Sequence, residues 1–201
     1  DALWKRVIGE LFEDFLLFFA PELYEQVDFT KAPDFLQQEL FKELIDDKKG
    51  TKYVDQIVKV HLKNGKEKWI LVHIEVQGEN ESHFPKRMFQ YFYRIYDKYG
   101  REIVAFAVIT DSKESGKSTT FNYDYYGTKL DYAYNVFKVK DYDAGELEKS
   151  PRLFSKIVLA AKYLHETKGD AEKRLKFKVK LMREIIKIKN EPRTSILAVM
   201  Y

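Results

Sequence analysis

The chain has 201 residues, 33% charged and 45% hydrophobic, and this balance is typical of a globular protein and excludes a disordered one. It contains no cysteine, which excludes disulfides and thiolate metal sites and fits a cytoplasmic location. The net charge of +3 hides a basic last quarter, because residues 151–201 hold 13 Lys and Arg against 5 Asp and Glu.

The first expected element is a helix over residues 3–19, which ends before Pro21 because proline cannot continue a helix. The most apolar part of this helix runs from Phe15 to Ala20. It is too short for the core of a signal peptide or for a membrane span. We therefore expect no membrane partner.

A second helix is expected to begin at Pro33 and Asp34, where a stretch of leucines recurs at helical spacing. Glu39 and Glu43 stack one turn apart beside these leucines. Either glutamate could therefore present a carboxylate next to the apolar face of this helix.

Two strands follow, over residues 52–63 and 66–77, and they join at Asn64-Gly65, a strong indication of a hairpin. Apolar side chains occupy the even-numbered positions of both strands, so we expect the even-numbered face to be the core. The odd-numbered face carries Asp55, Lys59, His61, His73, Glu75 and Gln77.

The turn decides whether the two acids of this face meet. A two-residue loop at Asn64-Gly65 would set odd positions opposite even ones and would separate Asp55 from Glu75. A three-residue loop that begins at Lys63 and ends in a left-handed glycine would place Asp55 opposite His73 and diagonal to Glu75. Only the second register preserves the apolar alternation of both strands. We therefore expect Asp55, Glu75 and Gln77 to cluster.

The rest of the chain alternates between strands and helices. Expected are a helix over 82–100, a buried strand over 102–111, Tyr-rich strands over 119–126 and 131–140, and helices over 152–167 and 170–189. We expect the tyrosines of 123–134 to cover a sheet surface. The central order is therefore α-β-β-α-β.

These elements predict an α/β fold with a mixed sheet flanked by helices and a helical C-terminal region. With no Pro/Gly/Ser-rich linker, the chain is expected to form one domain. Its parts are an N-terminal helical segment over 1–34, an α/β core over 35–142 and a basic helical region over 143–201.

Two neighbouring carboxylates repel each other unless something neutralises them. A shared proton, Lys59, a histidine or a divalent cation could do so, and a purely structural ion network with Lys59 stays an alternative. Mg²⁺ typically takes one or two protein carboxylates, which Asp55 and Glu75 would supply. A glycosidase also uses two carboxylates, but the chain offers no aromatic sugar platform beside them. His61 and His73 are more typical of hydrogen-bonded strand residues than of metal ligands.

The stretches "YVDQIVKV", "HIEVQGENESHFPKRMFQYFYRIYDKYG" and "VAFAVITD" resemble the PD-(D/E)XK nuclease superfamily and, within it, the recombination-promoting nuclease and transposase-like family of bacteria. The resemblance covers residues 35–111 best. It implies a restriction-endonuclease-like core and a DNA endonuclease that is linked to recombination or mobile elements. It leaves the oligomeric state open, with a homodimer as one arrangement.

The resemblance also implies the roles of individual residues. Asp55 and Glu75 would hold Mg²⁺ or Mn²⁺ together with the backbone carbonyl of Val76. Gln77 stands where the superfamily usually has lysine, so it would orient a water without adding charge, and activity is expected to be weak. Glu39 would complete the catalytic site, with Glu43 as the alternative. If Gln77 marks lost catalysis, the chain is instead a nucleic-acid-binding or assembly module.

Contacts with DNA are expected from the helix over 82–100, where Arg87, Tyr91 and Arg94 share a face. The arginines could bind phosphates and the tyrosine could stack on bases, although packing against the sheet explains this pattern equally well.

The basic C-terminal helix is a second candidate for a polyanion, with an expected apolar stripe through Leu175, Val179, Met182 and Ile186. A solvated helix face is the alternative for this helix.

The stretch "GKS" at 116–118 resembles the end of a P-loop, the phosphate-binding loop of many nucleotide-binding proteins. A P-loop has its first glycine five residues earlier, where this chain has Asp111, so a nucleotide cofactor is not expected.

Overall fold

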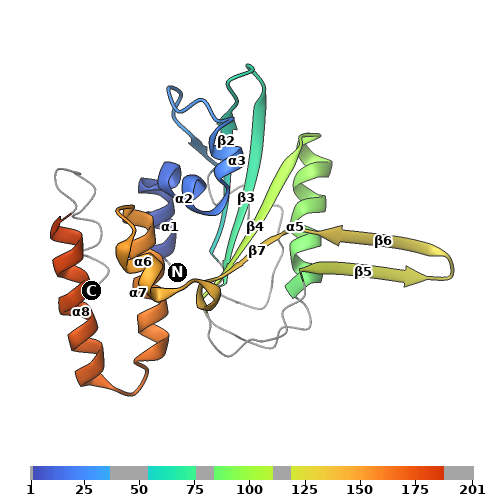
Figure 1. Ribbon diagram of the computed structural model, residues 1–201. Coiled ribbons are helices and arrows are strands. Elements are labelled where there is room, and N and C mark those ends of the chain that lie inside the picture. The colour runs from blue at the N-terminus through green and yellow to red at the C-terminus, as the bar shows by residue number, and fades with distance from the viewer. Residues whose placement is uncertain (1, 37–53, 76–83, 111–118, 188–201) are drawn as a thin grey trace. The chain divides into compact units, whose positions relative to one another are not determined.

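The computed structural model describes residues 2–36, 54–75, 84–110 and 119–187 (Figure 1). The chain forms two compact units. The sheet unit contains residues 26–109 and 113–137, and the helical unit contains residues 2–25 and 138–201 together with 110–112. The expectation of one domain stays a prediction.

A five-stranded mixed sheet forms the centre of the sheet unit, in the order β1-β2-β3-β4-β7. Strand β2 pairs antiparallel with both β1 and β3, whereas β3 and β4 are parallel. Strands β5 and β6 form a separate antiparallel pair. The bounds are β1 Asp34–Phe35, β2 Val54–His61, β3 Glu67–Glu75, β4 Ile103–Ile109, β5 Thr120–Tyr125, β6 Thr128–Ala133 and β7 Asn135–Lys138. The expected mixed α/β class is therefore confirmed.

The turn between β2 and β3 has three residues, as the alternation predicts. The Leu62 amide donates to the Lys66 carbonyl at 2.7 Å, and the Gly65 amide donates to the Leu62 carbonyl at 2.8 Å. Gly65 has a φ of 81°, a left-handed conformation that costs glycine nothing and other residues about 1 kcal/mol. The loop over 63–65 therefore sets the predicted register, in which Asp55 pairs with His73.

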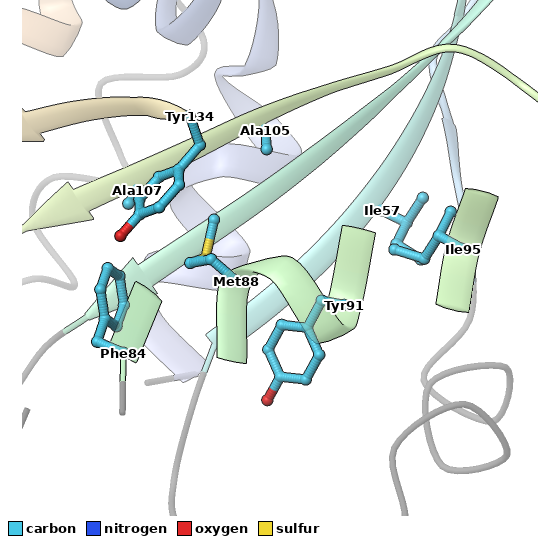
Figure 2. Packing of buried hydrophobic residues seen from close by; sticks show 8 residues of the cluster. All are labelled: Ile57, Phe84, Met88, Tyr91, Ile95, Ala105, Ala107 and Tyr134. Carbon is cyan, nitrogen blue, oxygen red and sulfur yellow. The ribbon is translucent and has the colours of Figure 1, made fainter. Parts of the chain in front are cut away.

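A helix connects the parallel strands β3 and β4. Helix α5, Phe84–Tyr99, ends at Gly100, which has a φ of 57°. The buried side of α5 packs on the sheet in a cluster whose members are Ile57, Phe84, Met88, Tyr91, Ile95, Ala105, Ala107 and Tyr134 (Figure 2). Ile57, Ala105 and Ala107 are odd-numbered strand residues. The odd-numbered face is thus covered by α5, which corrects the expectation that only the even-numbered face, with Val58 and Val60, is core.

Helices from both ends of the chain build the helical unit. They are α1 Ala2–Glu10, α2 Phe12–Phe19, α3 Pro21–Tyr24, α6 Ala144–Lys149, α7 Leu153–Glu166 and α8 Ala171–Lys187, with a short 3₁₀ turn over Val139–Asp141. The ring of Phe154 lies 5.5 Å from that of Phe15 and 5.6 Å from that of Phe19, between centroids. The N-terminal segment therefore packs with α7 rather than standing apart from the C-terminal region. In the part of the chain that is described, no helix is both long and apolar enough to cross a bilayer.

Three expected elements differ from the observed ones. The helix over 3–19 divides at Leu11, two residues after Gly9, whose helix propensity is low. Asp34 and Phe35 form β1 rather than a helix start, because they pair with β2 and the Leu36 amide donates to the Ile57 carbonyl at 3.0 Å. The second Tyr-rich strand divides into β6 and β7.

Candidate metal and nucleic-acid site

The two acids of the hairpin occupy neighbouring positions on one face of the sheet. Asp55 pairs with His73 across β2 and β3, and Glu75 stands two residues beyond His73 on the same strand. Residues two apart on a strand share a face, and diagonal cross-strand neighbours lie about 7–8 Å apart. The backbone therefore brings both positions within the span of a single small ligand.

Helix α5, which covers this face, begins near the end of the sheet that carries Asp55 and Glu75. His73 pairs with Ala107 on β4, and Ala107 belongs to the cluster that contains Phe84, the first residue of α5 (Figure 2). The last turns of α5 lie at the other end, because Ile95 contacts the cluster together with Ile57. The amino end of a helix carries a partial positive charge, which favours anionic groups near it.

Lys59 forms its ion pairs at the opposite end of the hairpin from Asp55. Its ammonium lies 3.5 Å from the Asp34 carboxylate and 3.9 Å from the Glu67 carboxylate. Four residues along a strand separate Lys59 from Asp55 by about 13 Å, which is beyond the reach of a lysine side chain. The alternative of an ion network between Lys59 and the acid pair therefore finds no support in the structure.

Several predicted site residues lie outside the described residues: Val76, Gln77, Glu39 and Glu43, together with the "GKS" stretch at 116–118. Among the side chains that are described, no group of three or more His, Asp or Glu residues gathers as a metal site. The roles of Val76, Gln77, Glu39 and Glu43 therefore stay predictions.

Arg87, Tyr91 and Arg94, which the sequence places on one face of α5, differ in burial. Tyr91 is 3% exposed and packs in the cluster, so it offers no surface for a base and the packing alternative holds for it. Arg87 is half-buried with its guanidinium 5.3 Å from the Phe84 ring centroid. Burial raises the pKa of Tyr134, and the nearby Arg87 partly opposes that rise. Arg94 is also half-buried, and the expected phosphate contacts of both arginines stay predictions.

Helix α8 buries a different stripe from the expected one. Leu175, Val179 and Met182 are exposed by 62%, 41% and 49%, whereas Leu181 and Ile185 are buried. The helix packs on α7, where the Phe177 ring stacks on the Tyr163 ring with centroids 3.9 Å apart. Both stripes have helical spacing, so spacing alone could not choose between them.

The exposed surface of α8 combines these apolar side chains with cations. Over residues 171–185 the exposed basic residues are Lys173, Lys176, Lys180 and Arg183. Lys176 pairs with Glu172 at 2.7 Å and Lys180 with Glu148 at 2.6 Å. An anionic partner would meet both charge and apolar area on this helix.

Comparison of this chain with protein-family models, with curated protein sequences and with solved structures finds no match.

Proposed function

We propose that this protein is a metal-dependent DNA endonuclease with a restriction-endonuclease-like core. The observation that carries the proposal is the β2–β3 register, which places Asp55 and Glu75 on the same face of the sheet. The order β2-β3-α5-β4 within a mixed sheet agrees with the expected core, whose first helix would come from residues outside the described ones. A link to DNA recombination or mobile elements belongs to the same proposal.

The residues present fit a hard divalent cation. Asp55 and Glu75 supply two carboxylates, the number that Mg²⁺ commonly takes from a protein, and Lys59 is paired elsewhere. The Val76 carbonyl would be the third protein ligand. The cation, Mg²⁺ or Mn²⁺, would polarise the phosphate and lower the pKa of a water. Gln77 would orient that water, and Glu39 or Glu43 would complete the site.

A binding module without catalysis is the second candidate. The exposed Lys173 and Arg183 of α8 favour it, because cations offer phosphate contacts that need no catalytic site, whereas Lys176 and Lys180 pair with Glu172 and Glu148. Gln77 also lacks the positive charge that lysine would bring to the reacting phosphate.

Plasmid cleavage with Mg²⁺, with Mn²⁺ and with EDTA tests the first candidate. Asp55→Asn removes a ligand charge at constant shape, so we expect both cleavage and Mg²⁺ binding, measured by calorimetry, to be lost. Asp34→Asn is the matched control, since it makes the same change beside β2 at the other end of the sheet. It should leave both properties unchanged.

Two results would contradict the proposal. Cleavage by the Asp55→Asn variant would mean that the site lies elsewhere. Intact DNA with both the wild type and Gln77→Lys, while both proteins still bind DNA, would leave only the binding module.

A further inference from the structure

The hairpin of β5 and β6 has one aromatic face and one polar face. In its register Phe121 pairs with Tyr132, Tyr123 with Leu130 and Tyr125 with Thr128, so these six residues share a face. The opposite face carries Asn122, Asp124, Lys129 and Asp131. A two-stranded hairpin is marginally stable alone, so its aromatic face needs a partner surface.

Among the described residues, contacts with α5 cover the base of this aromatic face. The Phe121 ring stacks on that of Phe89 with centroids 5.2 Å apart, and the Tyr132 ring lies 4.9 Å from that of Phe92. Both phenylalanines belong to α5. Further toward the turn, Tyr123 is 45% exposed and Tyr125 is 62% exposed. In Figure 1 the two strands extend from α5 as a long arm.

The turn of the hairpin holds an aromatic residue in a strained conformation. Tyr126 has a φ of 46° and Gly127 a φ of 85°, so the turn needs a left-handed conformation at both residues, where Asn and Gly are favoured. A tyrosine there costs about 1 kcal/mol or more. Tyr126 is 93% exposed, so its side chain gains little from the fold of its own chain. A residue that is both strained and exposed indicates a contact outside the monomer.

Helix α5 continues the uncovered surface. Tyr93 and Tyr96 are 54% and 51% exposed, and their rings stack on Phe89 and Phe92, the residues that hold the hairpin. The sheet unit therefore presents one aromatic surface, the tyrosine surface, with members Tyr93, Tyr96, Tyr123, Tyr125 and Tyr126. The stacked rings of Phe89 and Phe121 connect its two parts, and exposed aromatic patches of this size mark interaction sites.

Charge and area point to a second copy of this chain as the occupant. Residues 120–133 hold one Lys against two Asp, which disfavours nucleic acid, whereas α5 holds four Lys and Arg against one Asp and attracts the hairpin. With about 200 Å² for a fully exposed tyrosine, the tyrosine surface offers about 600 Å² per copy. A two-fold pairing uses the surface twice and buries about 1,200 Å², the lower end of the range for specific complexes.

We propose that the hairpin of one copy docks its aromatic face on Tyr93 and Tyr96 of a second copy. The hairpin of the second copy docks on the same residues of the first, which gives a symmetric dimer. The proposal is independent of the endonuclease activity. Two chemical features recognise the partner: tyrosine rings pack on tyrosine rings, and the acidic polar rim of the hairpin meets the basic helix.

Sedimentation equilibrium of the purified full chain measures this dimer. We expect a micromolar dimer whose Kd rises at least about tenfold in the Tyr123→Ser/Tyr125→Ser double variant, since buried tyrosines are frequent hot spots. Leu175→Ser is the matched control, because Leu175 is exposed by 62%, as Tyr125 is, but lies on α8. Thermal unfolding at a concentration where all are monomeric checks that the variants fold alike.

Cross-linking tests which surfaces meet. The chain contains no cysteine, so a mixture of a Tyr125→Cys copy and a Tyr93→Cys copy under mild oxidation should yield a disulfide-linked pair of unlike copies. A wild type that stays monomeric, a Kd unchanged by the tyrosine changes, or no link between the unlike copies would each overturn the proposal. Loss of DNA affinity in the double variant of a monomeric protein would overturn it as well, with nucleic acid as the occupant.

Discussion

Glu148 connects three helices of the helical unit, and its charge should contribute measurably to stability. Its carboxylate accepts hydrogen bonds from the Tyr163 hydroxyl on α7 and from the Lys180 ammonium on α8, the latter at 2.6 Å. The side chain of Glu148 is 27% exposed, so solvent weakens these bonds only in part. Hydrogen bonds to Lys180 and Tyr163 lower the pKa of Glu148, whereas burial raises the pKa of Tyr163 and keeps its hydroxyl a donor.

The Glu148→Gln variant keeps the size of the side chain and removes its charge. Two hydrogen bonds to a charged acceptor, discounted for the partial exposure, correspond to about 1–2 kcal/mol. For a chain of this length that loss lowers Tm by about 3–6 °C. Glu172→Gln is the matched control, because Glu172 lies 2.7 Å from Lys176 on α8 while its side chain is 79% exposed. It should change stability little.

The pH dependence has a definite sign. Because the folded state lowers the pKa of Glu148 below its usual 4.5, the stabilisation is present above that value and is lost as pH falls through the folded pKa. Urea unfolding measures the free energy of unfolding of wild type and of Glu148→Gln. The two free energies should therefore differ strongly at neutral pH and little in acid. An equal difference at both values, or none at neutral pH, would refute the reasoning.

Three further variants test the fold. Met88→Ala should destabilise the protein by about 2–4 kcal/mol in urea unfolding, because Met88 is fully buried on the sheet side of α5 and its loss leaves a cavity; a loss below about 1 kcal/mol would show that the neighbouring side chains fill the cavity. Gly65→Ala should cost about 1 kcal/mol through its positive φ, since nothing crowds the added Cβ, and an unchanged Tm would contradict this. Asp143→Ala should lose about 1 kcal/mol, as the Asp143 carboxylate caps α6 through the Glu146 amide at 2.9 Å, and Asp141→Ala is the comparison that should change little.

The hairpin register could be predicted because two independent constraints agree. Alternation of apolar residues along both strands demands one register, and Gly65 supplies the turn that this register needs. The end of α5 at Gly100 was likewise predictable from a local feature, the left-handed glycine.

Elements that depend on distant parts of the chain could not be predicted. Strand β1 has two residues and forms only because β2 offers an edge, and no periodicity marks so short an element. Two stripes of α8 carry apolar residues at helical spacing, and packing on α7, where Tyr163 stacks on Phe177, accompanies burial of the one with Leu181 and Ile185. Tyr91 looks like a stacking residue until α5 is placed on the sheet, where its ring enters the core.

The joining of both chain ends in one helical unit has a consequence for synthesis on the ribosome. Helices α1 and α2 leave the ribosome before α7, whose Phe154 packs against Phe15 and Phe19 and which is made some 130 residues later. Translation adds about 5–20 residues per second, so the interval lasts several seconds or more. During that interval Phe15 and Phe19 lack the Phe154 ring against which they pack in the folded protein. We therefore expect a chain that stops before α7 to leave the apolar side of α2 without this cover and to bind chaperones that hold apolar segments.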